Sequence, residues 1–491
     1  MINLTYLEFY SGIGGWGYAL EQACRSIQRA SAISLMDQVA PQQKKSKLAD
    51  GDDEKFNLTT TLLASYDHSD LCNSVFMHNH IVQGKSKSTT KTLKPRQTSI
   101  EKITRKELEA HSATIWCMSP PCQPHTRQHS NQYKEMDDPR SKSFLHLCDL
   151  LKDMEEDTLP CLLLLENVIG FESTWGNSSM DLNEPLGSEL SPIGSFARWR
   201  QVLSLRQYEV AHFHLDAAHV GLPNSRPRYY CIAFRRENLS HRMLNHRFKN
   251  LDSNILVDRI TSGNIFTREN LNEEPHIHSE KIFAMLNSME STETASMPEI
   301  QQFLDADLTT QIKSDNKGLN AKEKSLQVPP KLKNSSSAWC FDIVTPHHTF
   351  SSCFTHSYGK YIRGTGSILY TGPLRLSDAD EEGADTSIPS METFLLETPG
   401  ERNYDENWSD NINWGHLRYF SGTEIARIMG FPVLAPAAKH FATDYDARQF
   451  SFPSSCTMKQ QWKLLGNSLN VRVAAKVAEI GLQAIFNDIT K

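Results

Sequence analysis

A strand, a glycine-rich turn and a helix follow one another at the start of the chain. An apolar stretch at residues 4–10 leads into SGIGGWG and then into the helical pattern WGYALEQACRSI. Gly12, Gly14 and Gly17 have the GxGxxG spacing, which allows a tight turn and a close approach of a ligand to the backbone. Nicotinamide, flavin and S-adenosylmethionine sites all use such a turn, and a plain strand-to-helix turn explains it equally well. The pattern predicts the opening of a doubly wound α/β domain.

Strands and helices continue to alternate as far as residue 234, which predicts a parallel or mixed sheet. Strands are expected at 60–67, 113–119, 161–168, 209–217 and 228–234, and helices at 68–80, 143–154 and 196–207. The polar segment 31–56 is expected to be a solvated loop. Periodicity is lost after residue 234 and returns at 417–432 and 468–486. We therefore predict one domain from residues 1–236 and 414–491, and a second from 237–413 that carries long insertions.

Composition limits the compartment and the partners. No long uncharged apolar run is present, which argues against a membrane span, and the N-terminus lacks a signal-peptide pattern. We therefore expect an intracellular protein whose ten cysteines are reduced. The cysteines form no CxxC pair and no zinc spacing, so no metal site is expected. A net charge of −7 argues against a surface that binds polyanions everywhere, but it allows a local basic cleft.

The stretch CMSPPCQPHTRQ, residues 117–128, directly follows a predicted strand. Its prolines restrict the backbone and would hold Cys122 at the carboxyl edge of the sheet, where ligands bind in such folds. An attacking thiolate needs this exposure and rigidity, whereas an inert loop cysteine is the alternative. Cys117 lies among apolar neighbours and is expected to be a core thiol.

Two further segments deliver charged groups to the same edge. Glu166 ends the apolar strand CLLLLENV, so burial should raise its pKa and let it bind or protonate a ring nitrogen. Arg226 and Arg228 in NSRPRYY could clamp a carbonyl or a phosphate, with surface salt bridges as the alternative. Asp67, at the end of the second strand, suits ribose hydroxyls or, equally, a helix N-cap.

These motifs together resemble those of the cytosine-5 methyltransferases. FYSGIGGWG, SPPCQP, LLLENV, NSRPRYY and LLGNSLNV stand in the family's order and cover about residues 4–236 and 415–485. SSCFTHSYGKYIRGTGSILY, residues 351–370, is similar to the branch that methylates cytosine 38 in the anticodon loop of aspartate tRNA. The resemblance implies a Rossmann-like S-adenosylmethionine-dependent methyltransferase domain with a mixed seven-stranded sheet, plus a smaller target-recognition domain.

The resemblance also implies roles for individual residues. Cys122 would add to C6 of cytosine, Glu166 would contact N3 and the amino group, and Arg226 with Arg228 would support the base carbonyl and the active-site loop. Asp67 would bind the ribose and His68 would lie near the adenine. The implied cofactor pocket comprises Tyr10, Gly12, Ile13, Gly14, Gly15, Asp67, His68, Ile100, Pro120, Asn467 and Ser468. Its ligand would be S-adenosyl-L-methionine, with S-adenosyl-L-homocysteine as the product.

The Cys-Phe-Thr segment favours a tRNA substrate, because a base in a loop costs less to present than one in a duplex. The predicted substrate contacts are Arg127, Cys353, Thr355 and Lys360, with Arg363, Arg418 and Lys463 as further basic positions. Cys353 is equally explained as a second active-site thiol or as a small core residue. We expect a monomer in the cytoplasm, with the nucleus as a second compartment, that binds tRNA-Asp and, weakly, DNA.

Two other functions stay open at this point. A DNA cytosine-5 methyltransferase would use the same chemistry on a duplex. A catalytically silent RNA-binding or regulatory protein is the other alternative, because His125 stands where the family usually has phenylalanine.

Overall fold

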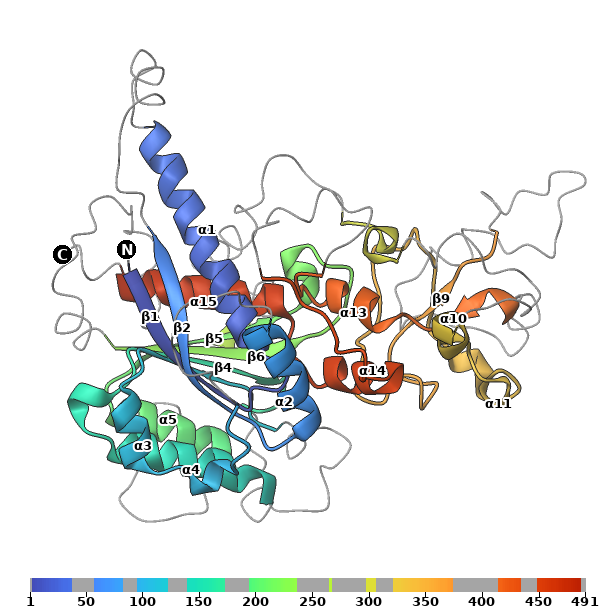
Figure 1. Cartoon of the computed structure of the whole chain (residues 1–491). Helices are drawn as coiled ribbons and strands as arrows, with labels where there is room; N and C mark the ends of the chain where they lie inside the picture. The colour runs from blue at the N-terminus through green and yellow to red at the C-terminus, as the bar shows by residue number, and fades with distance from the viewer. Residues whose placement is uncertain are drawn as a thin grey trace, which may run out of the picture.

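A computed structural model describes most of the chain (Figure 1). The residues it describes are 2–37, 57–82, 95–121, 139–172, 194–235, 265–266, 297–305, 321–373, 414–433 and 448–486.

A mixed sheet of seven strands forms the centre of the larger part. Its order is β2-β1-β3-β4-β6-β5-β7, and β6 runs antiparallel to both of its neighbours while the other pairs are parallel. The strands are β1 Ile2–Phe9, β2 Leu58–Tyr66, β3 Ile115–Met118, β4 Leu162–Val168, β5 Glu209–Leu215, β6 Arg228–Phe234 and the two-residue β7 Ile265–Phe266. The predicted Rossmann-like architecture with a mixed seven-stranded sheet is confirmed.

Helices cover both faces of this sheet (Figure 1). One face carries α1 Gly15–Asp37 and α15 Val471–Phe486, and the other carries α3 Arg105–His111, α4 Pro139–Asp153 and α5 Ser195–Leu205. Side chains of β4 alternate between two buried clusters, with Leu162 and Leu164 in one and Leu163 and Leu165 in the other. This burial on both faces explains why β4 reads as an unbroken apolar run.

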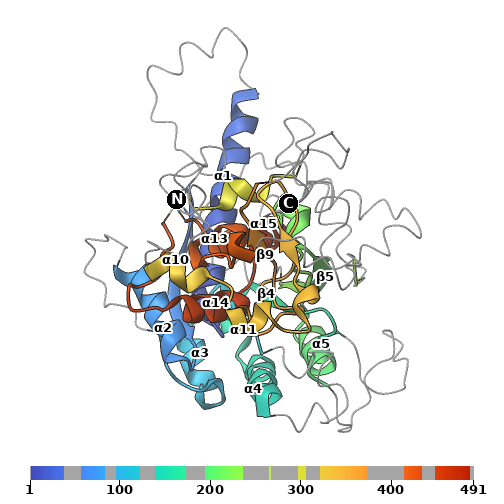
Figure 2. The ribbon, with the colours of Figure 1, turned by 90° about the vertical axis from the view of Figure 1, so that its right-hand side faces the viewer.

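A smaller part lies beside the large sheet (Figures 1 and 2). Its sheet has the order β10-β9-β8, with β8 Ile343–Val344, β9 Ile368–Tyr370 and β10 Leu417–Arg418. The helices around it are α10 Ala321–Leu326, α11 Pro330–Lys333, α13 Gly422–Ile428 and α14 Met458–Gly466. β10 belongs to the segment assigned from sequence to the larger domain, and it pairs with β9 of the smaller one.

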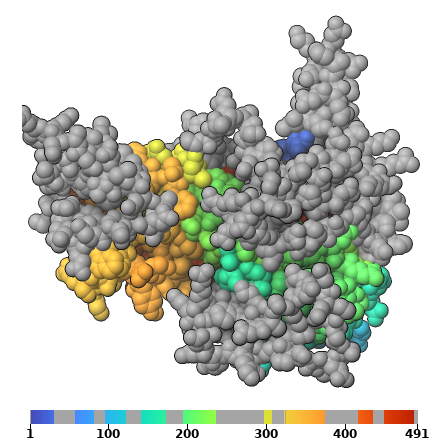
Figure 3. Space-filling model, turned by 180° about the vertical axis from the view of Figure 1, so that it is seen from behind, coloured from blue at the N-terminus to red at the C-terminus, as the bar shows by residue number. Residues whose placement is uncertain are grey.

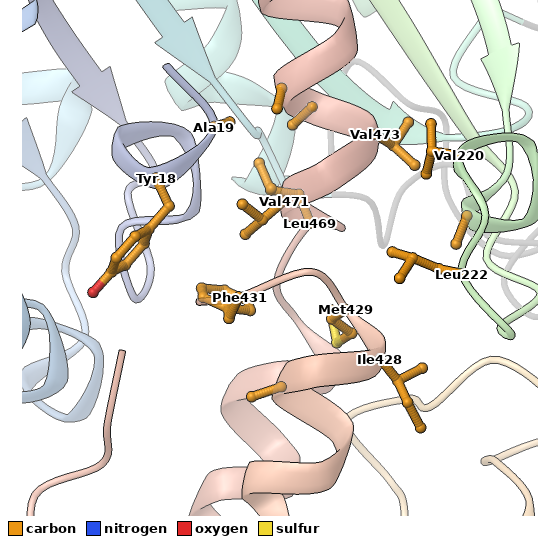
Figure 4. Close-up of a cluster of buried hydrophobic side chains, with 14 of the residues drawn as sticks. Tyr18, Ala19, Val220, Leu222, Ile428, Met429, Phe431, Leu469, Val471 and Val473 are labelled. Atoms are coloured by element: carbon orange, nitrogen blue, oxygen red, sulfur yellow. The ribbon is translucent and has the colours of Figure 1, made fainter. Parts of the chain in front are cut away.

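One buried cluster joins the two parts. Figure 4 shows side chains of α1, of the segment around Val220 and Leu222, of the end of α13 and of the start of α15 converging in it. The backbone N–H of Val471 donates to the carbonyl of Met429 at 2.9 Å and fixes α15 against the end of α13. The core of the larger part therefore continues into the smaller part without a break.

Arg418 corrects a prediction made from the sequence. Its side chain is buried, and its two terminal nitrogens each donate to a Glu424 oxygen at 2.8 Å. A guanidinium that is buried and bidentate to a carboxylate has no free face for a phosphate. Arg418 is therefore an internal ion-pair residue, and the prediction that it is available to a phosphate was wrong.

The first helix is longer than expected. α1 runs to Asp37, so residues 31–37 are helical where a solvated loop was predicted. The stretch ASAISLM contains several good helix formers, and the polar composition of the following residues hid this. No helix in the described stretches is both long and apolar enough to cross a bilayer.

Candidate active site

The turn after β1 has the backbone geometry that its glycines predicted. Gly12 and Gly14 have φ values of 53° and 85°, and Tyr10 also has a positive φ of 55°. The Tyr10 hydroxyl donates to Ser143 Oγ at 2.9 Å, which holds this residue in its unusual conformation. Gly17 lies within α1, so the GxGxxG spacing spans the turn and the start of the helix.

Asp67 joins the glycine turn to the end of β2. Its Oδ2 accepts from the Gly12 N–H at 2.8 Å and its Oδ1 accepts from the Ser69 N–H at 2.8 Å. The N-cap of α2 Asp70–Met77 is Ser69, whose side chain accepts from the Cys72 N–H, so Asp67 is not the cap. Each carboxylate oxygen keeps a lone pair, and Asp67 can still accept from ribose hydroxyls.

The turn fits a ligand that approaches the backbone. A Cβ placed on Gly12 would meet no atom within 4 Å, so open space lies over this residue. The buried Ser11 Oγ has no hydrogen-bond partner among the described residues. An open backbone beside an unpartnered hydroxyl and a carboxylate matches a polar ligand with hydroxyl groups.

His80 lies beneath the turn, and no motif in the sequence indicated its place there. A Cβ on Gly14 would come within 2.1 Å of the His80 Nε2 atom, and one on Gly17 within 2.9 Å of its Cε1 atom. The ring stacks on Phe76 with centroids 4.1 Å apart. The glycines are therefore required by packing on this side as well as by backbone conformation.

The other predicted pocket residues lie around this turn. Leu469 packs against Gly15, since a Cβ there would be 3.0 Å from its side chain, and this brings Asn467 and Ser468 toward the turn. Ile13 and Ile100 are buried, whereas His68 is exposed. His68 interacts electrostatically with Glu101, which places it beside the Ile100 segment.

Glu166 is buried near the end of β4, as predicted. Burial raises the pKa of its carboxyl group, while Arg228, Arg226 and the Ser119 hydroxyl act in the opposite direction. Arg228 Nε lies 3.4 Å from Glu166 Oε1. The predicted direction of the pKa shift is confirmed, and the pair can present a proton donor and a cation to the polar edge of a base.

Ser119 links the glycine turn to Glu166. The indole Nε1 of Trp16 donates to Ser119 Oγ at 3.0 Å. Because an indole N–H can only donate, Ser119 keeps its own hydroxyl proton for Glu166, whose pKa it lowers. The serine stands in the SPPC motif, but the sequence did not indicate its role.

Arg226 connects three distant segments. Its Nη1 donates to the Phe354 carbonyl at 3.1 Å and to Cys353 Sγ at 3.2 Å. Its Nη2 donates to the Gly466 carbonyl at 3.1 Å and to the Ser468 carbonyl. The side chain is buried, so the alternative of a surface salt bridge is excluded. These contacts give Arg226 a positioning role between residues 351–370, which we call the recognition segment, and residues 466–468, which include two of the predicted cofactor residues.

The recognition segment packs directly against the base of the site. Figure 3 shows residues of the smaller part (orange) against green residues of the larger part. The Ser225 N–H donates to the Ser351 carbonyl at 2.8 Å. A Cβ on Gly466 would lie 2.1 Å from the backbone of Thr355 and His356, so the two backbones touch there. Thr355 Oγ1 accepts from the Ser357 N–H at 3.3 Å. Lys360 lies over the Tyr361 ring.

The nucleophile predicted from the sequence lies outside the described residues. Cys122, His125 and Arg127 belong to the stretch 122–138, so their predicted roles stay predictions. The described stretch that precedes Cys122 ends at Pro121. The carbonyl of Pro120 accepts from Asn167 Nδ2 at 3.5 Å. That contact brings the chain before Cys122 next to the neighbour of Glu166. Cys117 is fully buried and burial raises its pKa, as expected of a core thiol.

Comparisons with known proteins identify a family and several relatives of this chain. Residues 85–481 match the family described as C-5 cytosine-specific DNA methylase. The human protein named tRNA (cytosine(38)-C(5))-methyltransferase is 29% identical over 98% of this chain and 99% of its own length. A Dictyostelium discoideum protein named DNA (cytosine-5)-methyltransferase is 27% identical over 98% of this chain and 94% of its own.

Solved structures show the same fold. The structure of the Schizosaccharomyces pombe Dnmt2 methyltransferase matches with a TM-score of 0.56 and 22% identity, over 99% of this chain and 98% of that one. The Spodoptera frugiperda DNMT2 structure matches with a TM-score of 0.55 and 24% identity, over 98% and 99% of the two chains. With four-fifths of its length matched by one family, and with that family's fold, the chain belongs to the C-5 cytosine-specific DNA methylases.

Proposed function

We propose that this protein methylates C5 of cytosine 38 in the anticodon loop of tRNA-Asp, with S-adenosyl-L-methionine as the methyl donor. The observation that carries the proposal is the buried Glu166 beside Arg228, at the sheet edge where the SPPC segment begins. Relatives named tRNA (cytosine(38)-C(5))-methyltransferase that align over nearly the whole chain support the choice of RNA.

In the proposed reaction, the Cys122 thiolate adds to C6 of the cytosine. This addition makes C5 nucleophilic, whereas C5 of a cytosine without the added thiolate is a poor nucleophile. Glu166 in its protonated form donates to N3 and draws electron density from the ring, and Arg228 binds the base carbonyl. C5 takes the methyl group, loses its proton to a base, and the thiolate leaves as the ring double bond returns.

The cofactor would be held by the residues around the glycine turn. Asp67 would accept from the ribose hydroxyls, and the open backbone at Gly12 would admit the ligand. Asn467 and Ser468 would close the pocket, and the bonds from Arg226 hold that segment in place. S-adenosylmethionine supplies an electrophilic methyl group, and this chain's residues orient it toward the base.

The test is transfer of labelled methyl groups into an unmodified tRNA-Asp transcript. We expect labelling by the intact chain, no labelling by Cys122→Ala, and no labelling of a transcript in which cytosine 38 is replaced by uridine. Equal labelling by Cys122→Ala would refute the covalent step. Labelling of both transcripts would refute the position but keep the chemistry.

A second candidate is a DNA cytosine-5 methyltransferase. The family description and the Dictyostelium relative's name favour it. A duplex oligonucleotide in the same assay separates the two functions: labelling of DNA alone would replace the RNA proposal. Labelling of neither substrate, with cofactor bound, would indicate a silent binding protein.

A further inference from the structure

The segment after Cys353 forms a loop that is closed at its base. The Thr355 N–H donates to the Thr365 carbonyl at 3.0 Å, and Thr365 Oγ1 donates to the Tyr361 carbonyl at 2.9 Å. A compact surface loop whose ends meet in this way is frequently a functional element. We call residues 355–365 the recognition loop.

The inner side of the recognition loop is fixed by a buried tyrosine. The Tyr358 hydroxyl donates to the Ser367 carbonyl at 2.6 Å and accepts from the Phe420 N–H at 3.0 Å. Its ring packs edge-on against Trp462 with centroids 5.2 Å apart. Gly359, at a φ of 76°, lies directly against Trp462. The loop is therefore organised before any ligand arrives.

The outer tip presents an aromatic ring between two cations. Tyr361 is 55% exposed, which is unusual for a large apolar side chain in the described part of this protein. Lys360 Nζ lies 5.0 Å from the centre of its ring, and Arg363 is exposed two residues later. A ring in water flanked by positive charge has the chemistry that binds an unpaired nucleobase and its phosphates.

The base of the loop is anchored in the candidate active site. Cys353 and Phe354, just before it, accept hydrogen bonds from Arg226. Arg226 is two residues from Arg228, which pairs with Glu166. Tyr361 stands six positions after Thr355, so its backbone lies at most roughly 20 Å from the base of the loop. A few nucleotides next to a target base can span that distance.

We propose that Tyr361 is a stacking platform for an unpaired base near the target cytosine of an RNA loop, with Lys360 and Arg363 binding the flanking phosphates. This inference rests on the proposed function and adds the feature by which the substrate is selected. A base in a duplex has both faces covered by its neighbours and offers none to Tyr361. The platform therefore favours a loop over a duplex.

The test is binding of a fluorescently labelled RNA hairpin with the unmodified tRNA-Asp anticodon arm sequence, measured by anisotropy with S-adenosylhomocysteine present. Stacking of one base contributes about 1–3 kcal/mol, so Tyr361→Ala should weaken binding by roughly 5- to 150-fold. Tyr361→Phe keeps the ring and should bind within about twofold of the original protein. Leu205→Ala, which removes another exposed side chain far along the chain, is the matched control and should change nothing.

Salt dependence separates the two kinds of contact. Lys360→Gln and Arg363→Gln should each reduce the slope of log K against log salt by about 0.7, the value for one phosphate of a single strand, whereas Tyr361→Ala should leave the slope unchanged. Hairpin binding by Tyr361→Ala equal to that of the original protein overturns the inference. So does an equal loss in Tyr361→Phe, which would assign the effect to the hydroxyl group.

Two outcomes distinguish the stacking role of Tyr361 from the proposed methyl transfer. Ring-dependent hairpin binding without methyl transfer would keep the platform and refute the proposed reaction. Methyl transfer at cytosine 38 with unchanged binding by Tyr361→Ala would keep the reaction and refute the platform.

Discussion

Replacing Arg226 by lysine tests whether this residue holds the site together. The guanidinium donates from two separate nitrogens to the carbonyls of Phe354, Gly466 and Ser468. A lysine keeps the charge but has one nitrogen, which cannot reach both sides of the junction. We therefore expect about two buried carbonyls to lose their donor.

The size of the effect follows from those carbonyls. A buried acceptor without a donor costs about 1–3 kcal/mol, so the free energy of unfolding should fall by about 4 kcal/mol. With a urea m-value near 3 kcal/mol/M, the unfolding midpoint should fall by roughly 1 M. Affinity for S-adenosylhomocysteine should fall as well, because the Ser468 segment loses its tether.

Urea unfolding followed by tryptophan fluorescence measures this, and Arg105→Lys is the matched control. Arg105 is 43% exposed, and it bonds to the Asp153 carbonyl and to Glu109 at the surface. Its replacement should change the free energy of unfolding by less than about 0.5 kcal/mol. An Arg226→Lys protein with the original midpoint would refute the positioning role.

Three further changes test other parts of the site. Burial raises the pKa of Glu8 to about 8, so between the ordinary carboxyl pKa and pH 8 the folded protein keeps a proton that the unfolded chain has released. The free energy of unfolding should therefore fall as the pH rises through this range. In Glu8→Gln, unfolding measured at several pH values should show that this fall is gone. Gly466→Ala forces a methyl group into the Thr355 backbone and should lower the melting temperature strongly, whereas Gly364→Ala, with open space around it, should cost only about 1 kcal/mol of backbone strain. Ser119→Ala removes a group that lowers the pKa of Glu166, so the pH at which kcat/KM declines, as the protonated carboxyl is lost, should move upward; an unchanged pH profile would show that the hydroxyl does not act on Glu166.

Local features of the sequence predicted the sheet and its edge. The glycine turn, the apolar run of β4 and the carboxylate near its end are each visible in a few consecutive residues. Burial of Glu166 follows directly from its apolar neighbours, and so does the direction of its pKa shift. These predictions needed no knowledge of which segments meet in space.

The contacts of Arg226 and Arg418 could not be predicted in this way. Arg226 bonds to residues more than one hundred positions away in the chain, and no periodicity reports such a meeting. In the sequence, nothing distinguishes Arg418 from a basic residue at the surface. Its partner Glu424 lies in the first turn of α13 and accepts a hydrogen bond from it. The strands β8 and β9 have two and three residues, too few for an alternating pattern to be detected.

The reversed direction of β6 has a consequence for how the enzyme regains activity after unfolding. Arg228, the first residue of β6, pairs in register with Val168, the last residue of β4, and this register sets Glu166 and Arg228 side by side. Val168 and Arg228 are sixty positions apart, so the intervening chain must be ordered before the two strands pair. Contacts between residues so distant in sequence form slowly. Recovery of methyl transfer after dilution from urea should therefore lag behind recovery of helical circular dichroism. In such a refolding experiment, the return of methyl transfer reports when β6 has paired with β4.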